Sequence, residues 1–553
     1  MRSRFSLPLF AWLLHFFLSA CGASSTQNLP PPHRPSPPYP LTVLLIYDQL
    51  ASWALLLHEN ALDPAGAIPT AAKEGVFVER MRYEYAVTLT APGHASLATG
   101  LPPSIHGIST NYIWDRLRRK IVSIYDDGVH PVIGRQDRFA SLAPLRAITL
   151  ADRLVEHGHG RARIVAIGMK DRSVLPLGGR HPALSLWFDT KLARFTSTTA
   201  LHLQLPKWLD DFQAHNDWRN YAHPWFPLRN HSDLGPDDAK GEGGCGFDST
   251  FPHELTNPGD VEAFLCMPQA TQLLFELARR GVIEESLGED EIPDLLTISI
   301  ASTDYIGHAF GPESWEVRDH LIRVDRMAGD FLRWLSSRTH YALVITSDHG
   351  VAPLPERAHN HHLPSTAKRV SSVEEKAALE EALQARFGPT RSSWVEAWVV
   401  PWVYLNRELM GDGPNSTEIR TFVLQHLLKR PGIGFAIDVH SPHSPLSDSE
   451  DLNNLLWASV PPDPPGDFLV FPSIGSIADD GPEGTSHGSP HPYDLEVPLL
   501  FFAPRLKPTR LHSPVPFRCA TAILAHFLAI PWPRENQQPL PSLCPELVPY
   551  LSP

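Results

Sequence analysis

The sequence predicts an α/β fold in which a central, mostly parallel sheet is sandwiched by helices and interrupted by inserted cap and lobe segments. Three observations support this fold class. Short apolar runs resemble strands that are buried on both faces. Helical patterns follow several of these runs, as β-α-β units require. Ionisable residues gather where the runs end, which is where open parallel sheets bind their ligands.

Five apolar runs are the predicted strands. They occupy residues 41–47, 162–167, 295–301, 342–346 and 497–502. Between the third and the fourth, residues 315–336 have the pattern of a crossover helix with one buried face. The apolar residues on this face recur every three or four positions; they are Val317, Leu321, Val324, Ala328, Phe331 and Leu335.

Two long intervals interrupt this alternation of predicted strands and helices. Residues 180–290 are rich in Trp, His, Pro and Gly, and we expect loops and a cap over the site there. Residues 355–480 contain helical patterns at 373–387 and 419–428 and a β-like run at 397–405. We interpret both intervals as insertions into one catalytic domain over residues 41–553.

The composition excludes several classes of protein. Of the 553 residues, 42% are hydrophobic and 20% are charged, which is typical of a globular chain and not of a disordered or fibrous one. The 55 prolines argue against a bundle of long helices. The formal net charge of −14 gives no attraction to nucleic acid, so we expect no nucleic-acid partner.

The first forty residues have the pattern of an export signal and a tether. Arg2 and Arg4 precede an apolar stretch over residues 7–18, and residues 18–22 (LSACG) resemble a bacterial lipobox. This pattern predicts a lipoprotein signal peptide over 1–20, a lipid anchor at Cys21 and a Pro/Ser-rich tether over 21–40. The chain would then be periplasmic or anchored in the outer membrane. The alternative is ordinary cleavage after Ala20, with Cys21 an incidental thiol.

Four further cysteines permit two disulfides in an exported chain. They allow three connectivities, of which we favour the pairing of nearest neighbours, Cys245 with Cys266 and Cys519 with Cys544. None belongs to a CxxC pair, which argues against a thiolate zinc site.

Carboxylate and imidazole side chains lie at or near the ends of the predicted strands. The six residues are Asp48, Asp304, His308, Asp348, His349 and His487. A single residue of this kind is more often a cap or a satisfied polar group, but six at strand ends suit two tetrahedral zinc ions with three protein ligands each. A basic pair, Lys170 and Arg172, follows the second run.

Residues 88–100 predict a short helix with Thr90 as its N-cap and Gly100 as its stop signal. A helix N-terminus favours a phosphate-like dianion because its free N–H groups and dipole are positive. A threonine hydroxyl becomes a useful nucleophile only when a metal or a base lowers its pKa. Thr90 is therefore a candidate nucleophile if it lies beside the zinc ligands.

Seven motifs, in the same order along the chain, resemble the alkaline phosphatase superfamily, and within it the monomeric periplasmic phosphatases that use a threonine nucleophile. The motifs are residues 47–48 (YD), 90–94 (TAPGH), 106–111 (HGISTN), 170–172 (KDR), 304–308 (DYIGH), 347–350 (SDHG) and 485–488 (TSHG). The similarity spans residues 41–525, with weak support inside the two insertions.

The resemblance implies a role for each site residue. One zinc would be held by Asp304, His308 and His487. The second would be held by Asp48, Asp348 and His349, with the Thr90 oxygen as its reactive ligand. Asn111 and Arg172 would hold phosphoryl oxygens, Lys170 would reach them as charge develops, and a phosphothreonine would form at Thr90. We assign no metal to His94 or His106, and we expect His491 to orient the His487 loop or contact phosphate.

The resemblance also separates substrate classes. The phosphodiesterase and nucleotide pyrophosphatase branch generally lacks the basic pair Lys170 and Arg172, so a phosphomonoesterase is favoured and a phosphodiesterase is the alternative. The sulfatases need a Cys or Ser where this chain has Thr90, and the dimeric alkaline phosphatases use serine and a third metal. A zinc-binding surface lipoprotein without turnover is the remaining alternative, which the intact Thr90 and Asn111 disfavour.

Overall fold

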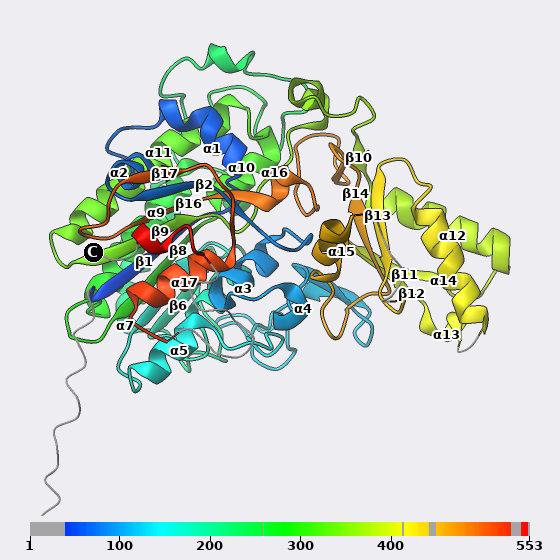
Figure 1. Ribbon diagram of the computed structural model, residues 1–553, viewed down its shortest axis with the longest axis horizontal. Helices are drawn as coiled ribbons and strands as arrows, with labels where there is room; N and C mark the ends of the chain where they lie inside the picture. The colour runs from blue at the N-terminus through cyan, green and yellow to red at the C-terminus, as the bar shows by residue number, and fades with distance from the viewer. Residues whose placement is uncertain (1–38, 258, 412–413, 442–448, 532–543, 551–553) are drawn as a thin grey trace, which may run out of the picture. The chain divides into compact units, whose positions relative to one another are not determined.

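A ten-stranded sheet forms the centre of the protein (Figure 1). The computed structural model describes residues 39–550 apart from 258, 412–413, 442–448 and 532–543. The strands lie in the order β17 (Thr509–Leu511), β2 (Val76–Arg82), β16 (Glu496–Phe502), β9 (Tyr341–Thr346), β1 (Leu41–Tyr47), β8 (Asp294–Ile300), β5 (Ile164–Gly168), β6 (Leu184–Asp189) and β7 (Arg194–Thr196), and β18 (Val515–Pro516) pairs with β2.

The middle of the sheet is parallel. β1 pairs in parallel with β8 and β9, and β5 pairs in parallel with β8 and β6. All five predicted strands are present, and the bounds of β1 are those predicted. β16 differs in direction, because it is antiparallel to both β9 and β2. The chain enters β16 from α16 (Pro492–Leu495) at the carboxyl edge of the parallel strands, so it must run back across the sheet.

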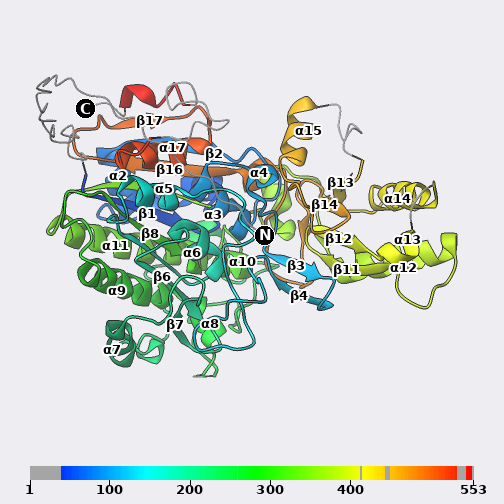
Figure 2. The ribbon, with the colours of Figure 1, turned by 90° about the horizontal axis from the view of Figure 1, so that it is seen from below.

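Helices cover both faces of the sheet, as the sequence predicts. In β1, Val43 and Leu45 belong to one hydrophobic cluster and Leu44 and Ile46 to another, because neighbouring side chains of a strand point to opposite faces. The first cluster includes α2 (Ala67–Glu74), α9 (Pro268–Glu284) and α11 (Trp315–Ser336). The second includes α3 (Thr90–Thr99), α5 (Leu150–His157), α6 (Asp171–Gly178) and α17 (Arg518–Phe527). Figure 2 shows α9 and α11 on one side of the sheet and α17 on the other.

The structure divides the interval 180–290 between the central layers and a loop region. β6 and β7 extend the main sheet, and α9 packs against α11, β5 and β8. Between α7 (Lys207–His215) and α8 (Val261–Leu265) the described chain has only short 3₁₀ turns, η2 (Trp218–Asn220) and η3 (Ser232–Leu234), and loops. A disulfide joins Cys245 in these loops to Cys266, and a second joins Cys519 to Cys544, which confirms the pairing of nearest neighbours.

The interval 355–480 forms a lobe with its own four-stranded antiparallel sheet. The strands are β11 (Val395–Val399), β12 (Trp402–Leu405), β14 (Phe468–Pro472) and β13 (Ile433–Asp438), in that order. One face of this sheet packs against α12 (Ser372–Phe387) and α14 (Pro414–Leu427). On the other face Trp402 and Tyr404 join the core of the main body. The lobe is therefore an insertion that shares a hydrophobic core with the central layers.

The predicted signal peptide, the predicted Cys21 anchor and almost all of the predicted tether lie outside the described residues. The described residues belong to a single compact unit. Within that part of the chain, no helix has the length and hydrophobicity that a membrane span requires.

Helix α11 buries a carboxyl group as well as its apolar face. Asp325 is fully buried, accepts hydrogen bonds from the Tyr47 hydroxyl at 3.0 Å and the Ile68 N–H at 2.8 Å, and leaves its second oxygen without a partner. Burial raises the pKa of Asp325 to about 7.

We therefore expect Asp325 to make folding pH-dependent. Because its pKa is higher in the folded chain than in the unfolded one, its contribution is most favourable below about pH 4 and declines until about pH 7. Asp325→Asn should remove this decline. The difference in free energy of unfolding, variant minus unmodified protein, should therefore increase by roughly 3–4 kcal/mol between about pH 4 and pH 7. Urea denaturation at pH 4–8 measures the difference. Asp330→Asn, at a half-exposed position on the same helix, is the control, and a pH-independent difference for Asp325→Asn would contradict the prediction.

Candidate active site

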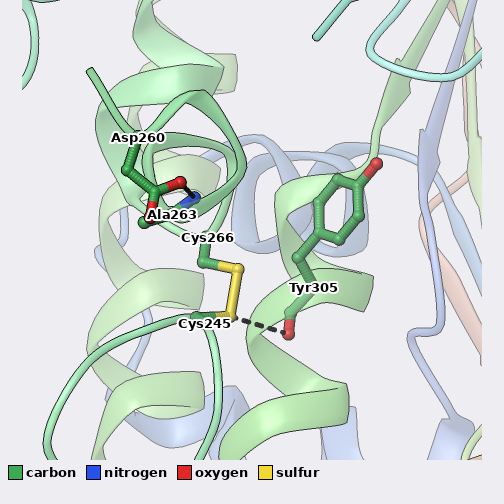
Figure 3. The surroundings of a disulfide bond; sticks show 5 residues. All are labelled: Cys245, Asp260, Ala263, Cys266 and Tyr305. Carbon is green, nitrogen blue, oxygen red and sulfur yellow. Dashed lines mark hydrogen bonds between the residues drawn. A yellow bond between two sulfur atoms is a disulfide. The ribbon is translucent and has the colours of Figure 1, made fainter. Parts of the chain in front are cut away.

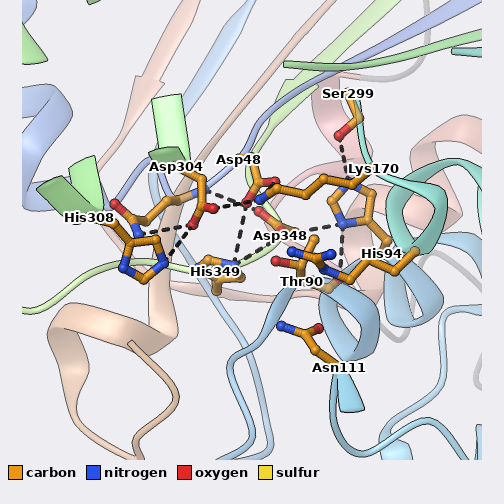
Figure 4. Close-up of polar contacts among 12 residues, drawn as sticks. Asp48, Thr90, His94, Asn111, Lys170, Ser299, Asp304, His308, Asp348 and His349 are labelled. Atoms are coloured by element: carbon orange, nitrogen blue, oxygen red, sulfur yellow. Dashed lines mark hydrogen bonds and ion pairs between the residues drawn. The ribbon is translucent and has the colours of Figure 1, made fainter. Parts of the chain in front are cut away.

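Three neighbouring parallel strands deliver the site residues to one edge of the sheet (Figure 4). Asp48 follows β1 directly. Asp304 and His308 lie one helical turn apart on α10 (Ser302–Phe310), which begins where β8 ends. Asp348 and His349 follow β9. Because the ends of β8, β1 and β9 are adjacent, side chains far apart in the sequence converge at this edge.

The first ligand group consists of Asp304, His308 and His487. The Oδ1 atom of Asp304 lies 3.2 Å from Nε2 of His308 and 3.5 Å from Nε2 of His487. The two Nε2 atoms are 3.2 Å apart. A tetrahedral zinc ion with ligand bonds of about 2.0–2.1 Å separates its ligand atoms by about 3.3–3.4 Å, so this triangle has the size of a zinc site.

The second ligand group consists of Asp48, Asp348 and His349. Nε2 of His349 lies 3.5 Å from Oδ1 of Asp48 and 3.3 Å from Oδ2 of Asp348. Nε2 of His349 and Oδ1 of Asp48 are buried and make no hydrogen bond, whereas Oδ2 of Asp348 is buried and lies 3.1 Å from Nδ1 of His94. Buried polar atoms that face each other without partners are the pattern left by a bound cation, so this group also fits a metal ion.

His349 lies between the two groups. Its ring stacks on that of His487 with centroids 3.6 Å apart. Its ligand atom also falls within 4.8 Å of those of Asp304 and His487, so it adjoins both candidate metal positions.

The histidines present the correct nitrogen to a metal. Nδ1 of His308 lies 2.7 Å from the Thr485 carbonyl oxygen, and Nδ1 of His487 lies 2.7 Å from that of Thr88. Nδ1 of His349 contacts the Gly350 carbonyl at 3.0 Å. A carbonyl oxygen can only accept, so each Nδ1 carries the proton and each Nε2 keeps a free lone pair.

Thr90 begins helix α3 beside the second ligand group. Its N-cap is Leu89, and no side chain caps the helix, so Thr90 is the first helical residue and not the predicted N-cap. The difference arises because Leu89 already has the extended backbone that precedes a helix. The Thr90 hydroxyl is thus left free for chemistry, and Figure 4 shows Thr90 between His349 and Asn111. Gly100 closes the helix with φ 70°, as predicted.

Asn111 is fixed against the start of α3 and held by the lobe. Its Oδ1 accepts the Ala91 N–H at 2.8 Å, so its NH₂ group remains available to a ligand. The segment around it contacts the lobe, where Thr110 donates to the Val400 carbonyl at 3.3 Å and Trp402 donates to the Ser109 carbonyl at 3.4 Å.

The hairpin that follows Asn111 is also tied to the lobe. It consists of β3 (Tyr112–Asp115) and β4 (Lys120–Ser123), and the Arg116 guanidinium at its end binds Asp467 at 2.7 Å and also contacts Glu396.

Lys170 lies between the two ligand groups. Its ammonium contacts Oδ2 of Asp48 at 2.7 Å and Oδ2 of Asp304 at 2.5 Å. Burial opposes its charge, but the two carboxylates raise its pKa, so it stays protonated. Arg172 is partly buried two residues further on, near the Tyr112 ring, and its Nε atom makes no hydrogen bond.

The three carboxylates repel one another and are compensated unequally. Burial and the neighbouring Asp348 hold the pKa of Asp48 well above its usual range. Although burial also opposes the ionisation of Asp304, Lys170 and His308 hold the pKa of that residue well below its usual range. The cluster therefore lacks positive charge, which a pair of metal cations would supply.

His94 and His106 make hydrogen bonds to other protein groups, as the sequence analysis expects, whereas the side-chain hydrogen bond of His491 is not with the His487 loop, and its contact with phosphate stays a prediction. His94 lies 2.9 Å from the Thr90 carbonyl, 3.0 Å from the Ser299 hydroxyl and 3.1 Å from Asp348 Oδ2, so it supports a ligand without joining either group. His106 contacts Ser96, and His491 contacts the Pro472 carbonyl at 3.1 Å.

Gln49 is a site residue that the sequence analysis missed. Its Nε2 donates to Asp304 Oδ1 at 2.9 Å, and its backbone N–H donates to Asp348 Oδ1 at 3.2 Å, so one residue orients a ligand of each group. Its left-handed backbone, with φ 72°, is rare for glutamine. On α10, Gly307 leaves room for it, because a Cβ there would lie 2.1 Å from Gln49 Oε1. The only signal in the sequence is its position next to Asp48.

Known alkaline phosphatases resemble this chain over most of its length. PafA, an alkaline phosphatase of Elizabethkingia meningoseptica, is 27% identical over 545 residues, which are 94% of this chain and 96% of PafA. The alkaline phosphatase PhoV of Synechococcus elongatus is 27% identical over 492 residues, covering 86% of this chain and 87% of PhoV. The crystal structure of wild-type PafA superimposes with a TM-score of 0.84 at 25% identity, covering 92% of this chain and all of that one.

The fold and the two ligand groups beside a helix N-terminus define an enzyme of the alkaline phosphatase superfamily. Within it, the chain belongs to the type I phosphodiesterase/nucleotide pyrophosphatase family, whose model matches residues 42–393.

The role of Gln49 can be tested through metal binding. Gln49→Met keeps an unbranched side chain of similar length but loses the donor to Asp304, so metal affinity should fall by about tenfold or more. Titration with a competing chelator measures the affinity without reference to turnover. Gln384→Met, on the exposed side of α12, is the matched control, and equal affinity in both variants would refute the role.

Proposed function

We propose that this chain is a zinc-dependent alkaline phosphatase that hydrolyses phosphate monoesters through a phosphothreonine at Thr90. One observation supports this most strongly: two ligand groups of the size of a zinc site lie close to Thr90 and to the basic residues Lys170 and Arg172. The relatives named as alkaline phosphatases cover nearly the whole chain, which supports the same reaction.

Asp304, His308 and His487 would hold one zinc ion, and Asp48, Asp348 and His349 the other. When bound, zinc supplies a Lewis acid that stabilises negative charge on oxygen at neutral or alkaline pH. Asn111 and Arg172 would orient the phosphoryl group by donating hydrogen bonds to its oxygens, and Lys170 would add positive charge as the transition state develops.

The reaction would proceed in two displacements. The Thr90 oxygen, having lost its proton, attacks phosphorus while the bond to the alcohol oxygen breaks and the alcohol takes up a proton. The N-terminus of α3 directs its positive end at the negative oxygens of the resulting phosphothreonine. Water then attacks phosphorus, the bond to Thr90 breaks, and inorganic phosphate leaves with the threonine restored.

The basic pair favours monoesters over diesters. A monoester carries one more negative charge on the transferring group than a diester, and Lys170 and Arg172 would answer it with two cations. A phosphodiesterase is the second candidate because the matching family model carries that description. We further propose that the enzyme is exported, is anchored through Cys21 and acts as a monomer, as its N-terminal pattern and its resemblance to monomeric phosphatases suggest.

Removal of the nucleophile should abolish turnover. In zinc-loaded protein, Thr90→Ala should lower release of phosphate from an aryl phosphate by at least about 1,000-fold, since no oxygen remains to take up the phosphoryl group. Acid-quenched unmodified enzyme should carry labelled phosphate on residue 90, and the variant should not. Thr421→Ala, on an exposed helix of the lobe, should leave both measurements unchanged. Full activity of Thr90→Ala would exclude this mechanism.

The substrate class can be tested with two esters. The unmodified enzyme should have a higher kcat/KM for an aryl phosphate than for the corresponding bis-aryl phosphate. Replacing Lys170 and Arg172 together by alanine should reduce that preference by about tenfold or more, because the dianion loses more stabilisation than the monoanion. Lys191→Ala, at an exposed position, is the control. A preference of the unmodified enzyme for the diester would favour the second candidate.

A further inference from the structure

A cavity of about 670 Å³ opens from the candidate site. Lys170, Arg172 and His308 line its inner end. This is the side of the first ligand group. Because Thr90 lies beside the second group and the leaving oxygen lies opposite the attacking one, we place the departing alcohol on this side. The cavity is far larger than a phosphate group, so it has room for the alcohol part of an ester.

The wall of this cavity is fixed in place by covalent and polar contacts. The Cys245–Cys266 disulfide lies beside α10, where Cys245 Sγ is 3.6 Å from the Tyr305 carbonyl (Figure 3). The adjacent Gly243 donates its N–H to the Ala309 carbonyl at 2.9 Å. These contacts fix the wall of the cavity formed by residues 260–266, which we call the outer wall, in its position relative to α10.

The charges on the outer wall are mostly negative. Asp260, Glu262 and Asp479 line the cavity, and the part of the chain that the structure describes gives none of them an ion-pair partner within 4.0 Å. Asp260 caps α8 by accepting the Ala263 N–H at 3.0 Å, Asp479 accepts the Gly481 N–H at 2.8 Å, and Glu262 is exposed. His308 and Arg369 act on Asp479 from a longer distance, so the negative charge of the outer wall comes mainly from Asp260 and Glu262.

Positive charge does not balance these carboxylates. Besides Lys170, Arg172 and His308 at the inner end, the described lining contains one more basic residue, Arg138. Its guanidinium is paired with Asp171 at 2.6 Å and lies 3.8 Å from Asp189, so little of its charge reaches the cavity. Uncharged surface comes from Tyr112 and Phe188, which suits a neutral alcohol.

We infer that this cavity selects phosphate monoesters whose alcohol part is neutral or carries an ammonium group, and discriminates against esters with a second anionic group such as a carboxylate or another phosphate. With the metal cations of the proposed function bound, the inner end would be cationic and the outer end anionic, so a substrate with one phosphate and a neutral or positive tail would match both. This inference rests on the proposed function and adds the chemistry of the leaving group to it.

Three esters of nearly equal size test the inference: 2-aminoethyl phosphate, 2-hydroxyethyl phosphate and carboxymethyl phosphate. At low ionic strength, kcat/KM should be higher for the aminoethyl ester than for the carboxymethyl ester by about fivefold or more. The ratio should shrink in 0.5 M NaCl, because salt screens charges in an open cavity. A ratio that stays the same in high salt would overturn the electrostatic basis.

Substitutions separate the pocket from the intrinsic reactivity of each ester. Glu262→Lys should lower the aminoethyl-to-carboxymethyl ratio by about fivefold, and Asp260→Asn, which retains a capping side chain, should lower it less. The intrinsic reactivity of each ester cancels because the variant and the unmodified enzyme are compared on the same ester. Glu291→Lys makes the same change in net charge before β8, at the opposite edge of the sheet, and should leave the ratio unchanged.

The outcomes distinguish this inference from the proposed function. If the zinc-loaded enzyme hydrolyses the hydroxyethyl ester but Glu262→Lys and Asp260→Asn leave the ratio unchanged, the inference is wrong and the proposed function stands. If the unmodified enzyme hydrolyses none of the three esters nor an aryl phosphate, both are wrong. A ratio that falls in Glu262→Lys and not in Glu291→Lys supports the charge selection.

Discussion

The constraint on which this structure depends is the convergence of three carboxylates in a buried place. Asp48, Asp304 and Asp348 come from neighbouring strand ends, so the topology of the sheet forces like charges together. Burial makes their repulsion stronger than it would be in water. Lys170 compensates part of it by contacting two of the three, and the remaining deficit is what makes the cluster a cation-binding centre. Several contacts hold these groups in place: the hydrogen bonds from the histidine Nδ1 atoms to backbone carbonyls, the two hydrogen bonds that Gln49 donates to Asp304 and Asp348, and the contacts of His94.

The inserted lobe participates in the site although it contributes none of the ligand residues. Its sheet shares Trp402 and Tyr404 with the main core, and it holds the segment that carries Asn111 through Ser109 and Thr110. Asn111 in turn binds the first free N–H of α3, next to Thr90. A change in the lobe can therefore reach the reacting groups through a short chain of hydrogen bonds. Substitutions far from the cavity would then affect the rate and not only the stability.

The sequence was most informative where a clear hydrophobic pattern marks a strand or helix and where a functional residue stands next to such an element. β1 and α11 have the predicted bounds because each has an uninterrupted hydrophobic period, and the structure brings the six predicted ligand residues together because each follows or precedes a buried strand. The direction of β16 was not predictable from its apolar run, since periodicity does not encode which way a strand runs. β6 and β7 were hidden in an interval whose composition resembles loops. Gln49 was missed because its role depends on a left-handed backbone that brings it between two distant residues.

The ligand residues are spread along the chain from position 48 to position 487, so only a nearly full-length polypeptide contains all of them. The group of Asp48, Asp348 and His349 is complete once β9 has formed, whereas the group containing His487 needs almost the entire polypeptide. Synthesis must therefore reach residue 487 before all six side chains are present in one chain. A product that ends before that point lacks His487, so its first ligand group stays incomplete and we expect it to have no phosphatase activity.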